Sequence, residues 1–110
     1  MTTRADLSID QGTDYEVTLT LTDENGNILD LSNSNTAAQI RKSYTSLSFT
    51  EFATSINSSA GEISLSLTAD QTGALEAGRY VYDVELTDAT NSVSRIVEGV
   101  VTITPQVTRL

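Results

Sequence analysis

The sequence predicts an all-β fold, an antiparallel sandwich of about seven to eight strands. Large side chains stand at every second position from Tyr80 to Leu86, which is the period of a strand with one buried face. Gly78 precedes this run at a tight corner. Similar short runs recur along the chain with polar turns between them, a spacing typical of a sandwich or barrel, and no helical period competes with them.

The N-terminal part predicts two strands and a hairpin. Apolar and polar residues alternate in Leu7–Asp10 and again in residues 15–21. Asn25 and Gly26 follow, a pair that favours a two-residue type I′ turn because both positions need positive φ. We therefore expect residues 28–31 to fold back on the preceding strand as a short hairpin.

The middle of the chain predicts a further strand at residues 37–44, with Ala38 and Ile40 directed inward. Residues 47–52 are less regular and could pair with it. After a polar loop at residues 57–61, the alternation of residues 63–67 predicts another strand.

The chain then predicts a single helical turn at residues 70–74, capped by Thr68 or Asp70. Tyr80, just after the corner, is a candidate corner tyrosine, with a structural role and a hydroxyl bonded to the backbone near Leu75.

Val93–Thr104 predicts one long final strand after a polar turn at residues 87–92. Gly99 interrupts it, which predicts a bulge where the inward and outward faces exchange. Pro105 should end the strand because proline has no N–H to donate.

The length and composition exclude several classes of function. A chain of 110 residues with 38% hydrophobic content is one domain, residues 1–110, with its core in 5–104 and loose tails at 1–4 and 105–110. It contains no Cys and no His, which excludes disulfides, structural zinc, and Ser-His-Asp or Cys-His catalysis. We expect no enzymatic activity, catalytic residue, cofactor or metal.

The charge of −9 argues against nucleic acid as a partner, because phosphate would be repelled. The few basic residues are scattered: Arg4, Arg41, Lys42, Arg79, Arg95 and Arg109. Neither a signal peptide after Met1 nor an apolar run of membrane-spanning length is present, so we expect synthesis in a host cytoplasm and no membrane partner.

Two acidic groups deserve a chemical interpretation. Residues 23–27 with Asp30 resemble a calcium loop only in having oxygen ligands, since the glycine is misplaced for an EF-hand and no bidentate Glu follows; a plain hairpin turn is expected. Asp83, Glu85 and Asp88 could be paired carboxylates for glycoside hydrolysis. A solvated strand face explains them better.

Lys42 is the only lysine, and composition allows a Ser-Lys dyad with Ser43 or Ser46. Adjacent strand residues point to opposite faces, which makes Lys42 with Ser43 a poor pair. Residues 41–44 are instead a basic island on an acidic molecule. The island either docks onto an acidic patch of a neighbouring subunit or protects a strand edge from pairing, and both alternatives stay open.

Three segments of the chain resemble the immunoglobulin-like N-terminal domain of tailed-phage baseplate upper proteins: residues 23–31 with 38–41, residues 61–67, and residues 75–86 with a closing 98–103. The match spans most of residues 15–104. It implies a Greek-key immunoglobulin-like sandwich without enzymatic activity. The baseplate proteins continue into helical and receptor-facing regions whereas this sequence stops at Leu110, so we expect a stand-alone module, similar to short immunoglobulin-like proteins of T4-like marine phages.

The resemblance implies a virion structural protein, an assembly or attachment module of the tail or baseplate that binds other virion proteins and could form homo-oligomers within the particle. A capsid decoration protein on the head surface and a carbohydrate-binding or host-adhesion module are alternatives, with a hydrolase third. An aromatic content of 5% without Trp disfavours sugar binding. The expected protein contacts are Arg41, Lys42, Tyr44, Phe49, Phe52, Arg109 and Leu110.

Overall fold

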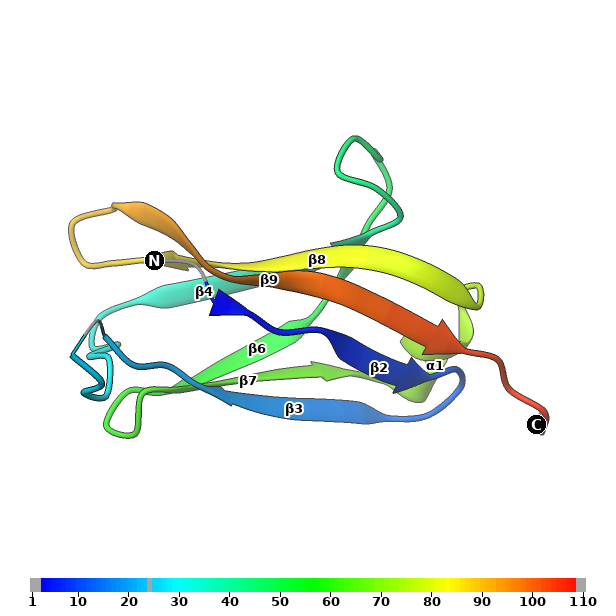
Figure 1. Ribbon diagram of the computed structural model, residues 1–110, viewed down its shortest axis with the longest axis horizontal. Helices are drawn as coiled ribbons and strands as arrows, with labels where there is room; N and C mark the ends of the chain where they lie inside the picture. Colours follow the sequence, from blue (N-terminus) through cyan, green and yellow to red (C-terminus); the bar gives the residue numbers. More distant parts are fainter. Residues whose placement is uncertain (1–2, 24, 109–110) are drawn as a thin grey trace.

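The computed structural model describes residues 3–23 and 25–108, which form two β-sheets packed face to face (Figure 1). The strands are β1 (Thr3–Arg4), β2 (Leu7–Asp10), β3 (Tyr15–Thr20), β4 (Asn35–Arg41), β5 (Thr50–Glu51), β6 (Ala53–Asn57), β7 (Glu62–Leu67), β8 (Gly78–Thr87) and β9 (Val93–Thr104). One short helix, α1 (Ala69–Gly73), connects β7 to β8.

The strand order is that of an immunoglobulin-like sandwich, as the sequence predicts. The larger sheet has the order β1-β9-β8-β4-β5 with β2 also on β9, and the smaller sheet has the order β3-β7-β6. The chain changes sheet between β2 and β3, β3 and β4, β5 and β6, and β7 and β8, the Greek-key connection of this fold. The expectation of a purely antiparallel sandwich is wrong in one respect, because β1 and β2 run parallel to β9.

The core lies between the sheets and is built from the alternating residues of each strand. In β7, Ile63 and Leu65 are fully buried, and in β8, Tyr82 and Val84 are buried. Ile40 and Ala38, each 1% exposed, confirm the expected inward face of β4. Because one face of every long strand is apolar, packing two sheets removes both apolar faces from water at once.

Of the loose tail expected at residues 1–4, residues 1–2 lie outside the described residues, and residues 3–4 form a strand instead. Thr3 and Arg4 pair with Val97 and Glu98 of β9. The Ala5 N–H donates to the Glu98 carbonyl at 2.9 Å, and the Tyr82 hydroxyl donates to the Ala5 carbonyl at 2.5 Å. Val97 and Glu98 are more than ninety positions from residues 3–5, and Tyr82 is 77 positions from Ala5. The local sequence therefore does not indicate these partners.

The expected bulge at Gly99 is misplaced. The register of β8 and β9 shifts between Val84 and Glu85, where Ile96 is the extra residue in β9, and Gly99 pairs regularly with Tyr82. A Cβ at Gly99 would lie 2.2 Å from the Ala5 carbonyl oxygen. Gly99 is therefore needed because the N-terminal backbone crosses directly against it.

The turn after β3 also differs from the expectation. The Gly26 N–H donates to the Asp23 carbonyl at 3.1 Å, and the Asp23 N–H donates to the Asn27 carbonyl at 2.8 Å. The turn is therefore closed between Asp23 and Asn27, and not around a two-residue loop of Asn25 and Gly26. Residues 28–31 do fold back on the preceding segment, through an antiparallel bridge between Thr22 and Ile28 and a hydrogen bond from the Leu29 N–H to the Leu21 carbonyl at 3.0 Å, but they form no strand.

The corner before β8 is confirmed. Thr68 caps α1, accepting from the Gln71 N–H at 3.2 Å while the Gln71 side chain accepts from the Thr68 N–H at 2.9 Å. The Tyr80 hydroxyl donates to the Glu76 carbonyl at 2.8 Å, one residue beyond Leu75. Strand β6 was missed because its sequence lacks a regular apolar alternation.

Candidate functional site

A loop of residues 42–49, here the projecting loop, connects β4 to β5 and stands away from the outer face of the larger sheet (Figure 1). The expected strand at residues 37–44 ends at Arg41, so Lys42 and Tyr44 belong to this loop. The edge-protection interpretation of the basic island therefore does not apply to them, since they are not in a strand.

Side-chain hydrogen bonds brace the loop from inside. The Arg41 guanidinium donates to the Ser46 carbonyl at 2.6 Å and to Gln39 Oε1 at 2.9 Å. The Ser43 N–H donates to Ser46 Oγ at 3.1 Å, and the Ser46 N–H donates to the Ser43 carbonyl at the same distance. Short hydroxyl side chains thus close the turn.

Three large apolar side chains of the loop face solvent. Tyr44 is 71% exposed, Leu47 93% and Phe49 50%. Phe49 lies under the Arg41 guanidinium, whose central carbon is 4.8 Å from the ring centroid. Single exposed apolar residues are ordinary on a protein surface, but three on one braced loop form a cluster that indicates a contact site.

Cations gather at the base of the loop without carboxylate partners. Lys42 Nζ donates to the Arg79 carbonyl at 3.0 Å and lies 4.7 Å from the centroid of the Tyr80 ring. Elsewhere in the described ranges, Arg4 pairs with Asp6 and Arg95 with two carboxylates, whereas Arg41, Lys42 and Arg79 form no ion pair there. The charges of these three side chains are therefore not neutralised by direct contact with a described carboxylate.

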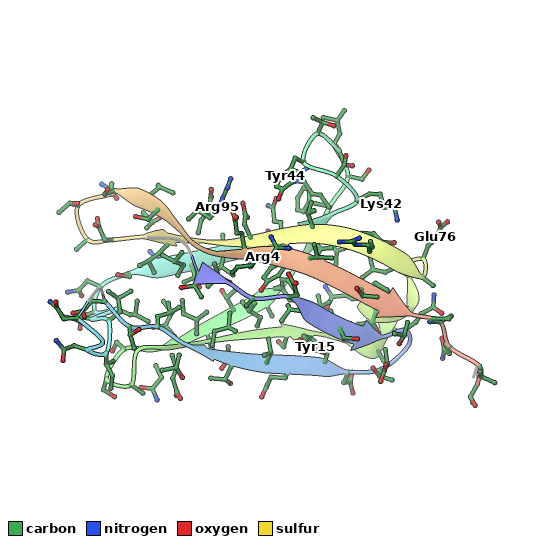
Figure 2. All side chains as sticks on the ribbon, viewed as in Figure 1. Arg4, Tyr15, Lys42, Tyr44, Glu76 and Arg95 are labelled. Atoms are coloured by element: carbon green, nitrogen blue, oxygen red, sulfur yellow. The ribbon has the colours of Figure 1, made fainter. Side chains whose placement is uncertain are left out.

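A shallow groove of about 240 Å³ lies beside the loop on the outer face of the larger sheet. Figure 2 shows Tyr44, Lys42 and Arg95 projecting from this side of the sheet. Arg95 contacts Asp83 and Glu98, each at 3.2 Å. The hydrogen bond that Arg95 donates to Glu98, together with the negative charge of Asp83, raises the pKa of Arg95. The lining also includes Gln39, Arg41 and Glu85. Sequence reasoning missed this groove, since its residues come together only through strand pairing.

One expected contact residue is wrong, and two lie outside the described residues. Phe52 is 3% exposed and packs edge-to-face against Tyr82, with ring centroids 6.0 Å apart. The burial of Phe52 could not be predicted from strand alternation, because β5 ends at Glu51 and the chain then crosses to the smaller sheet. Arg109 and Leu110 are not among residues 3–23 and 25–108.

Two of the acidic side chains accept hydrogen bonds from backbone N–H groups of the turns that they belong to. Asp23 Oδ1 accepts from the Asn25 and Asn27 N–H groups, and Asp88 Oδ1 accepts from Thr90 and Ser92. The hydrogen bonds from Thr90 and Ser92 lower the pKa of Asp88. Across residues 3–23 and 25–108 no group of three or more potential ligands is placed to hold a metal ion.

The Ser-Lys dyad finds no geometric support. Lys42 Nζ is directed to the Arg79 carbonyl, while Ser43 Oγ lies 3.0 Å from Ser46 Oγ. In the part of the chain that the structure covers, no helix is long and apolar enough to cross a membrane.

Comparisons with known proteins show the fold and no more. No family model matches the chain, and no curated protein matches it. An internalin-like protein of Listeria monocytogenes has a similar structure, with a TM-score of 0.53 and 22% sequence identity over 94% of this chain and 28% of that one. The chain thus spans little more than a quarter of the Listeria chain. An immunoglobulin-like sandwich serves many unrelated functions, so this likeness identifies an architecture.

Proposed function

We propose that this protein is a non-enzymatic binding module that attaches to other proteins through the projecting loop and the cations at its base. The observation that carries the proposal is the braced loop itself, with Tyr44, Leu47 and Phe49 exposed above Arg41 and Lys42. A rigid apolar projection loses little conformational entropy on binding, which favours association. The absence of His and Cys from the sequence supports a role without catalysis.

The setting that we propose is a phage particle, with the protein as a small structural subunit of the tail or baseplate that contacts other virion proteins. Support for this setting comes from the resemblance of residues 23–31, 61–67 and 75–86 to baseplate upper proteins. A decoration protein on the capsid is the alternative within the same setting. The chain's own surface features suit either location.

Fractionation of particles tests this proposal. The protein should co-purify in fixed stoichiometry with intact particles, and it should leave with the tails when these are sheared off. Retention on tail-free heads would favour capsid decoration instead. Absence from purified particles would refute the virion setting, and turnover of a polysaccharide by the pure protein would refute the non-enzymatic role.

A carbohydrate-binding or adhesion module is a second candidate because of the groove beside Tyr44. Its lining offers an exposed aromatic ring together with amide, carboxylate and guanidinium groups from Gln39, Asp83 and Arg95, the kinds of side chain that hold a sugar. Binding of the isolated protein to a glycan array, lost on Tyr44→Ala, would favour this function over the first.

A further inference from the structure

The exposed apolar side chains of the described residues fall into two main patches. Among the large ones, Tyr44, Leu47 and Phe49 belong to the projecting loop, while Val107 is in the C-terminal segment. The remaining two, Ile28 and Val93, are 57% and 59% exposed; Ile28 belongs to the turn after β3 and Val93 is the first residue of β9. In Figure 1 the turns after β3 and between β8 and β9 lie at the left end of the sandwich.

This second patch has the opposite charge to the loop. We call it the acidic end, defined as Ile28 and Val93 with the exposed Asp23, Asp30 and Asp88. Hydrogen bonds from Ser32 to Asp30, and from Thr90 and Ser92 to Asp88, lower the pKa of both carboxyls. The acidic end therefore stays negative at neutral pH beside its two apolar side chains.

We propose that the projecting loop of one copy docks against the acidic end of a second copy. This proposal rests on the binding role of the loop proposed above and names its partner. Leu47 and Tyr44 would contact Ile28 and Val93, and Arg41 and Lys42, which form no ion pair with the carboxylates that the structure describes, would meet carboxylates of the neighbouring copy.

Charge decides between this arrangement and symmetric ones. Two loops face to face would oppose cation to cation, and two acidic ends would oppose carboxylate to carboxylate. Loop against end brings opposite signs together. The overall charge of −9 repels two copies at a distance, but salt at physiological strength screens beyond about 8 Å, so pairs in contact dominate.

The arrangement is heterologous, since each copy uses two different surfaces. Every copy in such a contact still presents one unused loop or one unused acidic end. Association therefore continues head-to-tail into rows or closes into a ring, and it does not stop at a twofold dimer. A subunit that repeats along a particle surface needs this property.

Sedimentation velocity over a concentration series tests the proposal. The unmodified protein should show an average mass that rises beyond that of a dimer. Leu47→Ser removes the apolar tip of the loop, and Val93→Lys places a cation in the acidic end; each should weaken association about tenfold or more, as substitution of a central interface residue does. Val107→Ser is the matched control, because it removes an exposed apolar side chain, 96% exposed, outside both patches.

Mixing the two variants gives the decisive result. The Leu47→Ser copy keeps its acidic end and the Val93→Lys copy keeps its loop, so an equal mixture should form dimers of one copy each and nothing larger. A monomeric unmodified protein at millimolar concentration, a Val107→Ser variant as impaired as Leu47→Ser, or a mixture without mixed dimers would each overturn the proposal. If the protein stays monomeric but co-purifies with particles, the proposed self-association is refuted while the proposed binding role stands.

Discussion

Gly99→Ala should destabilise the protein by separating its N-terminal strand from β9. The added Cβ would lie 2.2 Å from the Ala5 carbonyl oxygen and 2.8 Å from the Ala5 carbonyl carbon, whereas relaxed contacts are about 3.5 Å. The backbone of residue 5 would have to move by more than about 1 Å. That shift would break the hydrogen bonds from Ala5 to Glu98 and from Tyr82 to Ala5.

The expected cost follows from these contacts. Overpacking of a core costs about 1 to 3 kcal/mol, and each lost hydrogen bond adds about 1 kcal/mol. We therefore expect a loss of about 3 kcal/mol in the free energy of unfolding. This is a large fraction of the roughly 5 to 15 kcal/mol that holds a domain of this size together.

Urea unfolding followed by circular dichroism measures the effect. With a slope of about 2 kcal/mol per molar, the midpoint should fall by about 1.5 M. Hydrogen exchange of residues 3–10 should also become faster. Gly73→Ala is the control, because its nearest neighbour is 3.7 Å away in a helical turn, and it should leave stability unchanged or raise it slightly.

The reasoning fails if Gly99→Ala and Gly73→Ala unfold at the same urea concentration. It also fails if Gly99→Ala is destabilised but the exchange of residues 3–10 is unaltered, since the clash would then be relieved elsewhere.

Three further predictions concern the cap, the core and a buried phenol. Thr68→Ala should cost about 1 kcal/mol in urea unfolding because it removes the cap of α1, and Thr68→Ser should restore most of it. Phe52→Ala should cost about 3 to 5 kcal/mol, while Phe49→Ala, half exposed, should cost under about 1 kcal/mol; equal losses would contradict the assignment of Phe52 to the core. Burial raises the pKa of Tyr82 to about 12 from 10.0. Its neutral form is favoured in the folded state, so the stability that depends on this group should be intact below pH 10 and should fall between pH 10 and about 12. Tyr82→Phe should abolish the last step of an ultraviolet titration of the tyrosines.

The strands that sequence predicts well are those with a regular alternation. Residues 63–67 and 80–86 alternate strictly, and both are strands with the expected inward faces. The long strand ending at Thr104 and the Tyr80 corner were also predicted, because proline and the corner geometry act over a few residues. Periodicity and turn chemistry are local, so one sequence is enough to recognise them.

The errors share a different cause. Gly99 was interpreted as a bulge, but the residue that requires it is Ala5, ninety-four positions earlier. Phe52 was expected to be a protein-contact residue, yet it is buried and packs on Tyr82. Both depend on contacts between segments distant in the chain, and nothing in the local pattern encodes the partner.

The candidate site divides in the same way. Sequence placed Arg41, Lys42, Tyr44 and Phe49 together because they are close along the chain. It did not place Arg79 beside Lys42, since β4 and β8 are brought together only when the sheet forms.

The order of amino acids by itself determined that this chain forms strands, which faces of most of them are apolar, and that it lacks the side chains of the common catalytic triads. Those properties follow from side-chain chemistry and a two-residue period. The tertiary structure alone decided that the first strand runs parallel to the last, that a braced loop stands above the larger sheet, and that residues of β4, β8 and β9 line one groove beside that loop. Strand pairing joins residues that are tens of positions apart, and the free energy that selects one pairing over another comes from the whole core.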